Sequence, residues 1–240
     1  MTNRTADSSQ LVYARIAGVA YILIIVIGVL SGTLIDSKLI VPGDDGLTAR
    51  NIMDNELLFR IGIIGALVMY AGVLLLSAAL YVVLEKVNRN LALLAMLLRS
   101  GEAIVGAATV LLSFVVLFLL NDEGRSTVFD TAQLHALAGV FLDVRAGGLD
   151  LVLVLVGLGG TVFLYLFFVS RYVPRALAAW GIFTYLSILV LAFVSILVPE
   201  LPVILETVLY ALGGAFELVF GFWLVFKGVD LHAGLGAPAS

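Results

Sequence analysis

The chain has 240 residues, of which 62% are apolar and only 12% are charged. Soluble domains carry roughly 45–50% apolar and about 25% charged residues, so this chain lacks the polar side chains that would cover a soluble globule. Its formal net charge is −4 and it has no cysteine, which excludes a basic nucleic-acid-binding protein, a disulfide framework and thiolate sites. The composition therefore predicts an integral membrane protein.

Six stretches are long and apolar enough to be membrane spans, because a helix needs about 20 mostly apolar residues to cross the hydrocarbon core. In chain order they are residues 16–35, 61–84, 91–120, 149–169, 176–198 and 203–226. The predicted fold is all-α, a polytopic transmembrane helix bundle that forms one integral membrane domain over residues 1–240. Residues 227–240 are predicted to be a flexible tail.

Residues 131–146 form a further apolar stretch that is too short to span. Asp143 and Arg145 interrupt it, and the pair Gly147 and Gly148 follows it. Glycine pairs weaken helices, so a break is expected there. We interpret this stretch as a seventh short helix, interfacial or re-entrant, that leads into the fourth span.

The lysine and arginine residues indicate the orientation, because positive residues are retained on the cytoplasmic side. The loops and tails on the side of both termini hold Arg4, Arg15, Lys86, Arg89, Arg171, Arg175 and Lys227. The opposite side holds Lys38, Arg50, Arg60, Arg125 and Arg145. The first set lies in shorter segments, and the second is accompanied by most of the acids. We therefore expect both termini to be cytoplasmic.

Three ionisable residues, Arg99, Glu102 and Glu217, fall deep within the predicted spans. An ionised side chain there costs roughly 2.5–3.5 kcal/mol, so it needs a partner. At about 1.5 Å per residue, Arg99 and Glu217 lie roughly 13 and 15 Å from the cytoplasmic edge. Arginine stays protonated when buried. We therefore predict that Arg99 pairs with Glu217 across the third and sixth spans, with Glu102 as a second partner.

Two interpretations of this Arg/Glu cluster remain open. It is either a buried ion pair that fixes helix register, or an anion-binding or proton-linked site in which Arg99 contacts a ligand carboxylate or phosphate. Further ionisable residues near span ends or in the short stretch are secondary candidates. They are Asp150, Glu206, His135 and Asp143.

Several kinds of chemistry lack their sequence signals. The lysines lie in loops or at span ends, which excludes retinal attachment, and two histidines cannot supply the four ligands of a bis-haem cytochrome. HExxH, GxSxG and Walker-type motifs do not occur, so no catalytic residue is predicted. His135, Asp143 and Asp150 could supply ligands to a divalent metal, but their spacing matches no motif. We predict no metal site, and the sequence indicates no cofactor.

Polar segments carry a family resemblance. The segments ARNIMDNELLFR (49–60), LYVVLEKVNRNLALLAMLLRSGEA (80–103) and SRYVPRALAAWG (170–181) resemble a bacterial family of multi-pass membrane proteins known as a domain of unknown function, DUF4386. RIAGVAYILIIVIG (15–28) and the stretch that contains Glu217 and Trp223 extend the resemblance over nearly the whole chain. It implies a bacterial cell membrane protein and no particular activity. The characteristic positions that it implies are Asn51, Arg60, Arg99, Glu102, Pro174 and Glu217.

A short amphipathic helix is expected to begin near Asn51 and Asp54, with Arg60 as an interfacial anchor of the second span. For function, the sequence favours small-molecule or ion binding or transport through the Arg/Glu cluster. The alternative is a structural or regulatory membrane subunit whose charges only fix packing, and an intramembrane enzyme is less favoured. The expected partners are the lipid bilayer and an anionic small molecule or lipid, without nucleic acid.

Overall fold

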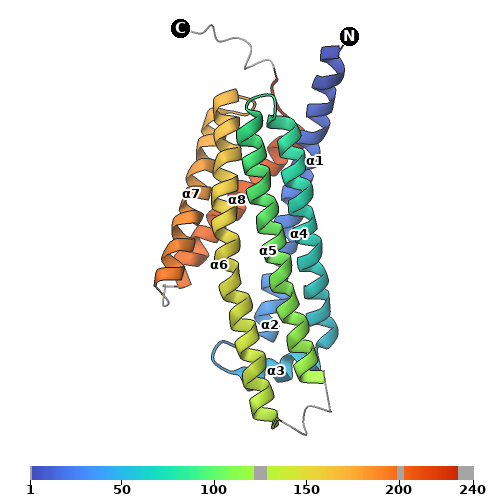
Figure 1. Cartoon of the computed structure of the whole chain (residues 1–240), viewed down its shortest axis with the longest axis vertical. Coiled ribbons are helices and arrows are strands. Elements are labelled where there is room, and N and C mark those ends of the chain that lie inside the picture. The colour runs from blue at the N-terminus through green and yellow to red at the C-terminus, as the bar shows by residue number, and fades with distance from the viewer. Residues whose placement is uncertain (1, 122–128, 199–202, 232–240) are drawn as a thin grey trace. The chain divides into compact units, whose positions relative to one another are not determined.

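The computed structural model describes residues 2–121, 129–198 and 203–231 (Figure 1). Within these residues the chain is helical and contains no strand. The predicted tail from residue 232 onward lies outside the described residues. The all-α fold expected from the composition is confirmed.

Six helices in the described part of the chain are long and apolar enough to cross a membrane. The first, α1 (Thr2–Leu30), continues through the π-helical segment η1 (Ser31–Asp36) into α2 (Ser37–Leu39). The other five are α4 (Glu56–Leu84), α5 (Arg89–Asn121), α6 (Thr131–Ser170), α7 (Arg175–Leu197) and α8 (Val203–Phe226). Large apolar side chains such as Ile64, Leu111 and Phe183 are exposed along them, as expected for helices that face lipid.

The predicted break at Gly147 and Gly148 is wrong, because α6 runs without interruption through 40 residues. A helical glycine costs about 1 kcal/mol relative to alanine, which the apolar helix formers on either side can offset. Residues 131–146 are therefore the first part of α6 and not a separate helix. At about 1.5 Å per residue, α6 is roughly 60 Å long, about twice the hydrocarbon thickness of a bilayer.

The short helix before the second span is α3 (Asp45–Asp54), so the expected start near Asn51 and Asp54 is also wrong. The helix begins earlier because Asp44 is its N-cap, whose Oδ1 accepts a hydrogen bond of 2.8 Å from the backbone N–H of Leu47. Asn51 lies in the last turn, where its side-chain amide donates to the carbonyl of Leu39 at 3.4 Å.

The contacts divide the chain into two compact units. Unit 1 consists of Met1–Ile25, Ala71–Ala103 and Asp150–Ser240, and unit 2 consists of Val26–Tyr70 and Ile104–Leu149. Helices α1, α4, α5 and α6 contribute residues to both units, whereas α7 and α8 belong to unit 1 alone. Each unit is considered separately below.

Unit 1 has a dense core of aromatic and small residues. The ring of Phe220 contacts those of Tyr21, Phe167 and Phe216, with centroids 5.3 to 5.6 Å apart. A Cβ added to Gly18 would lie 2.6 Å from the carbonyl oxygen of Gly221, so α1 and α8 approach each other backbone to backbone. Helices α7 and α8, orange and red in Figure 1, pack against each other. Small residues permit this close packing where lipid provides no hydrophobic drive for helix association.

Candidate functional site

The charge cluster predicted from the sequence lies in unit 1, where Arg99 and Glu102 are one turn apart on α5. The distance between Arg99 Nη1 and Glu102 Oε2 is 2.8 Å, and the two side chains are only 4% and 6% exposed. Neither atom makes a hydrogen bond of good geometry, so the contact is an electrostatic ion pair. Arg99 thus finds its counter-charge on its own helix.

The predicted Arg99–Glu217 pair is corrected by this geometry. Glu217, on α8, accepts a hydrogen bond of 2.7 Å from the hydroxyl of Tyr185, and that hydroxyl lies 3.2 Å from the hydroxyl of Tyr21. Arg99 interacts electrostatically with Glu217 but takes Glu102 as its ion-pair partner. A position three residues away on the same helix face is always within reach, whereas matching depth on two helices does not ensure that their side chains face each other.

Two glycines of α6 allow it to pack directly on this cluster. A Cβ on Gly159 would lie 2.9 Å from Cγ of Arg99, and one on Gly160 would lie 2.6 Å from the ring of Tyr185. Tyr21 and Tyr185 are fully buried. The cluster is therefore closely packed, and the aliphatic stem of Arg99 is covered.

The secondary candidates do not come together. His135, Asp143 and Asp150 lie along α6 at separations that correspond to roughly 10–12 Å between successive members at 1.5 Å per residue. Asp150 accepts a hydrogen bond of 3.1 Å from the hydroxyl of Ser195. Within the described residues, no group of three or more metal-ligating side chains occurs. The side chain of Glu206 lies outside the described residues.

Unit 2 contains a polar network that sequence reasoning missed. Arg145, on α6, donates from Nη1 to the hydroxyl of Ser113 at 2.9 Å and from Nη2 to Oδ1 of Asp36 at 3.2 Å. Arg145 and Asp36 are 27% and 45% exposed, so this ion pair is only partly buried. The network joins α6, α5 and η1, and 109 positions of sequence separate its two charged members.

This network lies in the wall of a cavity of about 660 Å³ within unit 2. The apolar part of the wall includes Ile35, Phe59, Ile63, Met69, Val110 and Leu142. The polar side chains in the wall are Ser31, Asp36, Tyr70, Thr109, Ser113, Asp143 and Arg145. Small-molecule sites commonly have volumes of about 300–1,000 Å³, mostly apolar walls and a few converging polar groups. We call this space the Arg145 cavity.

One wall of the Arg145 cavity is the π-helical segment η1, which provides Ser31, Gly32, Ile35 and Asp36. Single π-helical turns within α-helices are rare and frequently occur at functional sites. The side chain of Ser37, just beyond this segment, bonds to its backbone, since the Ser37 hydroxyl donates to the carbonyl of Thr33 at 2.6 Å. A Cβ on Gly32 would meet no atom within 4 Å, so the cavity is open beside it.

Two features of the sequence indicate this cavity when they are considered together. Asp36 and Arg145 have opposite charges, and the sequence predicts both on the same side of the membrane, outside the six spans. Ser113 is a polar residue within an otherwise apolar part of the third span. The assumed break at Gly147 concealed the connection, because it removed Arg145 from the long helix that carries it into the bundle.

A family comparison gives the chain its classification. The model of the family described as a domain of unknown function, DUF4386, matches residues 16–228. The chain belongs to this family. Its membership confirms the resemblance in the polar segments, and the family description assigns no activity. None of the curated proteins and none of the solved structures matches the chain significantly.

Proposed function

We propose that this DUF4386 protein binds a small amphipathic molecule in the Arg145 cavity. The observation that carries the proposal is the combination of an apolar space of about 660 Å³ with one polar network, formed by Asp36, Ser113 and Arg145, in its wall. The apolar body of the ligand would fill the space between the helices. Its headgroup would hydrogen-bond to the network.

The charges in the wall favour an uncharged headgroup, in contrast to the anion that the sequence suggested for the Arg/Glu cluster. Asp36 already provides the counter-charge of Arg145, and Asp143 adds a second negative charge to the wall. An anion would have to compete with Asp36, and a cation would have to displace Arg145. Arginine has five N–H donors, of which the Nη groups give one each to Ser113 and Asp36. A hydroxyl or carbonyl group can accept a hydrogen bond from the network while leaving the ion pair intact.

The Arg/Glu cluster in unit 1 supports the alternative considered from the sequence, a structural role. Arg99 and Glu102 neutralise each other within α5, and α6 covers the aliphatic stem of Arg99. We propose that Arg99, Glu102 and Glu217 stabilise the packing of unit 1 and that ligand binding takes place in unit 2.

The test of ligand binding uses a photoreactive 12-carbon alcohol that carries a diazirine, added to the purified full chain in lipid nanodiscs. We expect saturable crosslinks at residues that line the Arg145 cavity, mapped by mass spectrometry. Gly32→Leu fills open space in the cavity and should lower crosslinking at least tenfold. Gly147→Leu is the matched control, since Gly147 also has open space beside its Cα but does not line the cavity.

Equal crosslinking of the Gly32→Leu and Gly147→Leu proteins would reject the cavity as the binding site. Competition by unlabelled dodecanol, dodecanoate and dodecylamine then tests the headgroup. We expect dodecanol to compete best. Stronger competition by either charged compound would reject an uncharged headgroup while leaving the site in place.

We also propose that both termini face the cytoplasm, on the basis of the lysine and arginine distribution. Since the chain has no cysteine, single cysteines report their own accessibility. A membrane-impermeant maleimide applied to intact cells should label Asp54→Cys and spare Glu85→Cys. The reverse pattern would invert the proposed orientation.

A further inference from the structure

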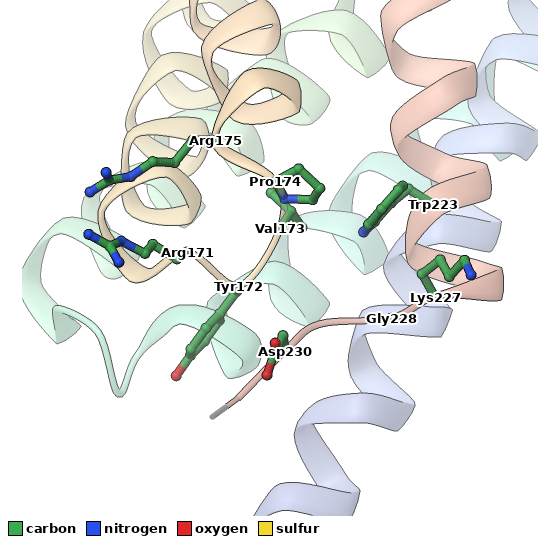
Figure 2. A pocket seen from close by; sticks show the side chains of 9 residues that line it. All are labelled: Arg171, Tyr172, Val173, Pro174, Arg175, Trp223, Lys227, Gly228 and Asp230. Atoms are coloured by element: carbon green, nitrogen blue, oxygen red, sulfur yellow. The ribbon is translucent and has the colours of Figure 1, made fainter. Parts of the chain in front are cut away.

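Unit 1 contains a pocket of about 500 Å³ where α6 and α8 end and α7 begins (Figure 2). The loop between α6 and α7 provides residues 171–174, and α7 provides its first residue, Arg175. Helix α8 with the segment after it provides Trp223, Lys227, Gly228 and Asp230. We call this space the basic pocket. Its place at the ends of three candidate spans puts it where a membrane meets water.

Positive charge predominates in the basic pocket. Arg171, Arg175 and Lys227 contribute three cations against the single carboxylate of Asp230. Arg171 and Arg175 are both exposed, and in Figure 2 their guanidinium groups point to the same side of the loop, away from Trp223 and Lys227. Neighbouring like charges repel each other, so an anion between or beside them would be stabilised.

Backbone contacts order the loop that carries Arg171 and leads into Arg175. Arg171 has a φ of 58°, in the left-handed region that side chains rarely adopt. The backbone N–H of Asp230 donates to the carbonyl of Tyr172 at 2.9 Å, which ties the segment after α8 to the loop after α6. The guanidinium of Arg175 lies 5.4 Å from the ring centroid of Phe168, in a cation–π contact. Arg171 directly follows the last residue of α6, a position at which a left-handed residue commonly ends a helix.

We propose that the basic pocket binds a phosphate group, either the headgroup phosphate of an anionic phospholipid or free phosphate. The neighbouring guanidinium groups of Arg171 and Arg175 match the geometry of phosphate oxygens. Trp223, in the wall of the pocket, has the amphipathic character of residues that lie at the level of lipid headgroups. This site is independent of the Arg145 cavity, and neither proposal rests on the other.

The chain has a built-in reporter for this site. It contains two tryptophans, Trp180 and Trp223, so Trp180→Phe leaves the pocket residue as the single tryptophan. In this background, the fluorescence of Trp223 is followed in two titrations. One adds inorganic phosphate to the protein in phosphatidylcholine nanodiscs, and the other raises the phosphatidylglycerol content of the nanodiscs without free phosphate.

We expect a saturable change in Trp223 fluorescence in at least one titration. Arg171→Gln combined with Arg175→Gln should weaken the apparent affinity at least tenfold. Arg15→Gln is the matched control, because Arg15 is an exposed arginine of unit 1 that does not line the pocket. Arg171→Gly is a second variant that removes a cation while glycine adopts the left-handed conformation freely, and it should weaken affinity about fivefold.

A response to inorganic phosphate alone would support free phosphate as the ligand, and a response to phosphatidylglycerol alone would support a lipid headgroup. The absence of a saturable response in both titrations would overturn the proposal. Equal responses of the arginine variants and the Arg15→Gln control would overturn it as well.

Discussion

The two units each contain an ion pair, and the pairs differ in how they are formed and how deeply they are buried. In unit 1, Arg99 and Glu102 are three residues apart on one helix and are almost entirely buried. In unit 2, Arg145 and Asp36 come from distant parts of the chain, remain partly exposed and line a cavity. A pair formed within a helix needs no space between helices, so its neighbours can pack onto it. A pair formed between helices keeps polar groups available in the wall of the cavity.

Individual glycines show the same contrast. In unit 1, added Cβ atoms on Gly160 and Gly181 would meet neighbouring side chains closer than 3 Å. In unit 2, Gly28 and Gly32 of the cavity wall have room for a side chain, whereas Gly106 packs against Tyr70 and Gly139 against Asp45. Gly28 and Gly32 thus leave space in the cavity wall, while tightly packed glycines occur in both units.

The largest expected effect is on the ion pair of unit 1. Glu102→Gln leaves the positive charge of Arg99 buried beside a neutral side chain, which should lower the free energy of unfolding by about 3–5 kcal/mol. Glu217→Gln keeps an oxygen that can accept from Tyr185, so its cost should be about 1 kcal/mol. Denaturant titration of both purified proteins, monitored by circular dichroism, measures the difference. A larger cost for Glu217→Gln would restore Glu217 as the main partner of Arg99.

Replacing the whole pair tests whether the charges themselves are needed. Arg99→Met combined with Glu102→Leu removes both charges from the apolar interior, and such replacements are often neutral or stabilising by about 1–4 kcal/mol. We expect the double variant to be at least as stable as the original chain by the same titration. A double variant as unstable as Glu102→Gln would argue for a role beyond packing.

The packing contrast between Gly160 and Gly32 predicts a smaller effect on stability. Gly160→Ala forces a methyl group into the ring of Tyr185, and overpacking of this kind costs about 1–3 kcal/mol. Gly32→Ala meets no atom within 4 Å and removes a helical glycine, so its stability should stay the same or rise by up to about 1 kcal/mol. Thermal unfolding in nanodiscs compares the two. Similar destabilisation of both proteins would mean that the cavity wall at Gly32 is as closely packed as the contact between Gly160 and Tyr185.

In unit 2, stability and ligand binding should respond separately. Arg145→Gln disrupts an ion pair that is partly exposed, so the free energy of unfolding should fall by only about 0–1 kcal/mol. Crosslinking to the photoreactive alcohol should fall at least tenfold, because the headgroup loses its main donor. Gly147→Leu remains the control for crosslinking. Unfolding costs above those of Glu102→Gln would mark Arg145 as a structural residue.

The smallest expected effect is a gain in stability. Arg171→Gly relieves a left-handed strain of about 1–2 kcal/mol and adds about 0.5–1 kcal/mol of chain entropy to the unfolded state, for a net gain of about 0.5 kcal/mol. The melting temperature should rise slightly while phosphate binding weakens. A lower melting temperature would mean that the arginine contributes more to the fold than its backbone costs.

Apolar run length was sufficient to predict the presence of six spans, because the bilayer fixes how many apolar residues a span needs. The sequence also identified Arg99, Glu102 and Glu217 as residues inside the bundle. It could not provide their pairing, since depth along two helices leaves the direction of each side chain undetermined. The Arg145 cavity escaped prediction for a related reason. Local glycine propensity suggests a break, whereas helix continuity depends on the strong helix formers on both sides of Gly147 and Gly148.

The hydrogen bond from Asp230 to Tyr172 has a consequence for biogenesis. It joins the loop after α6 to a segment that is synthesised only after α8 is complete. The nascent chain therefore exposes Arg171 and Arg175 to lipid and solvent well before Lys227 and Asp230 leave the ribosome. The basic pocket therefore becomes complete only after α8 has been synthesised, so a chain truncated before Lys227 would lack it.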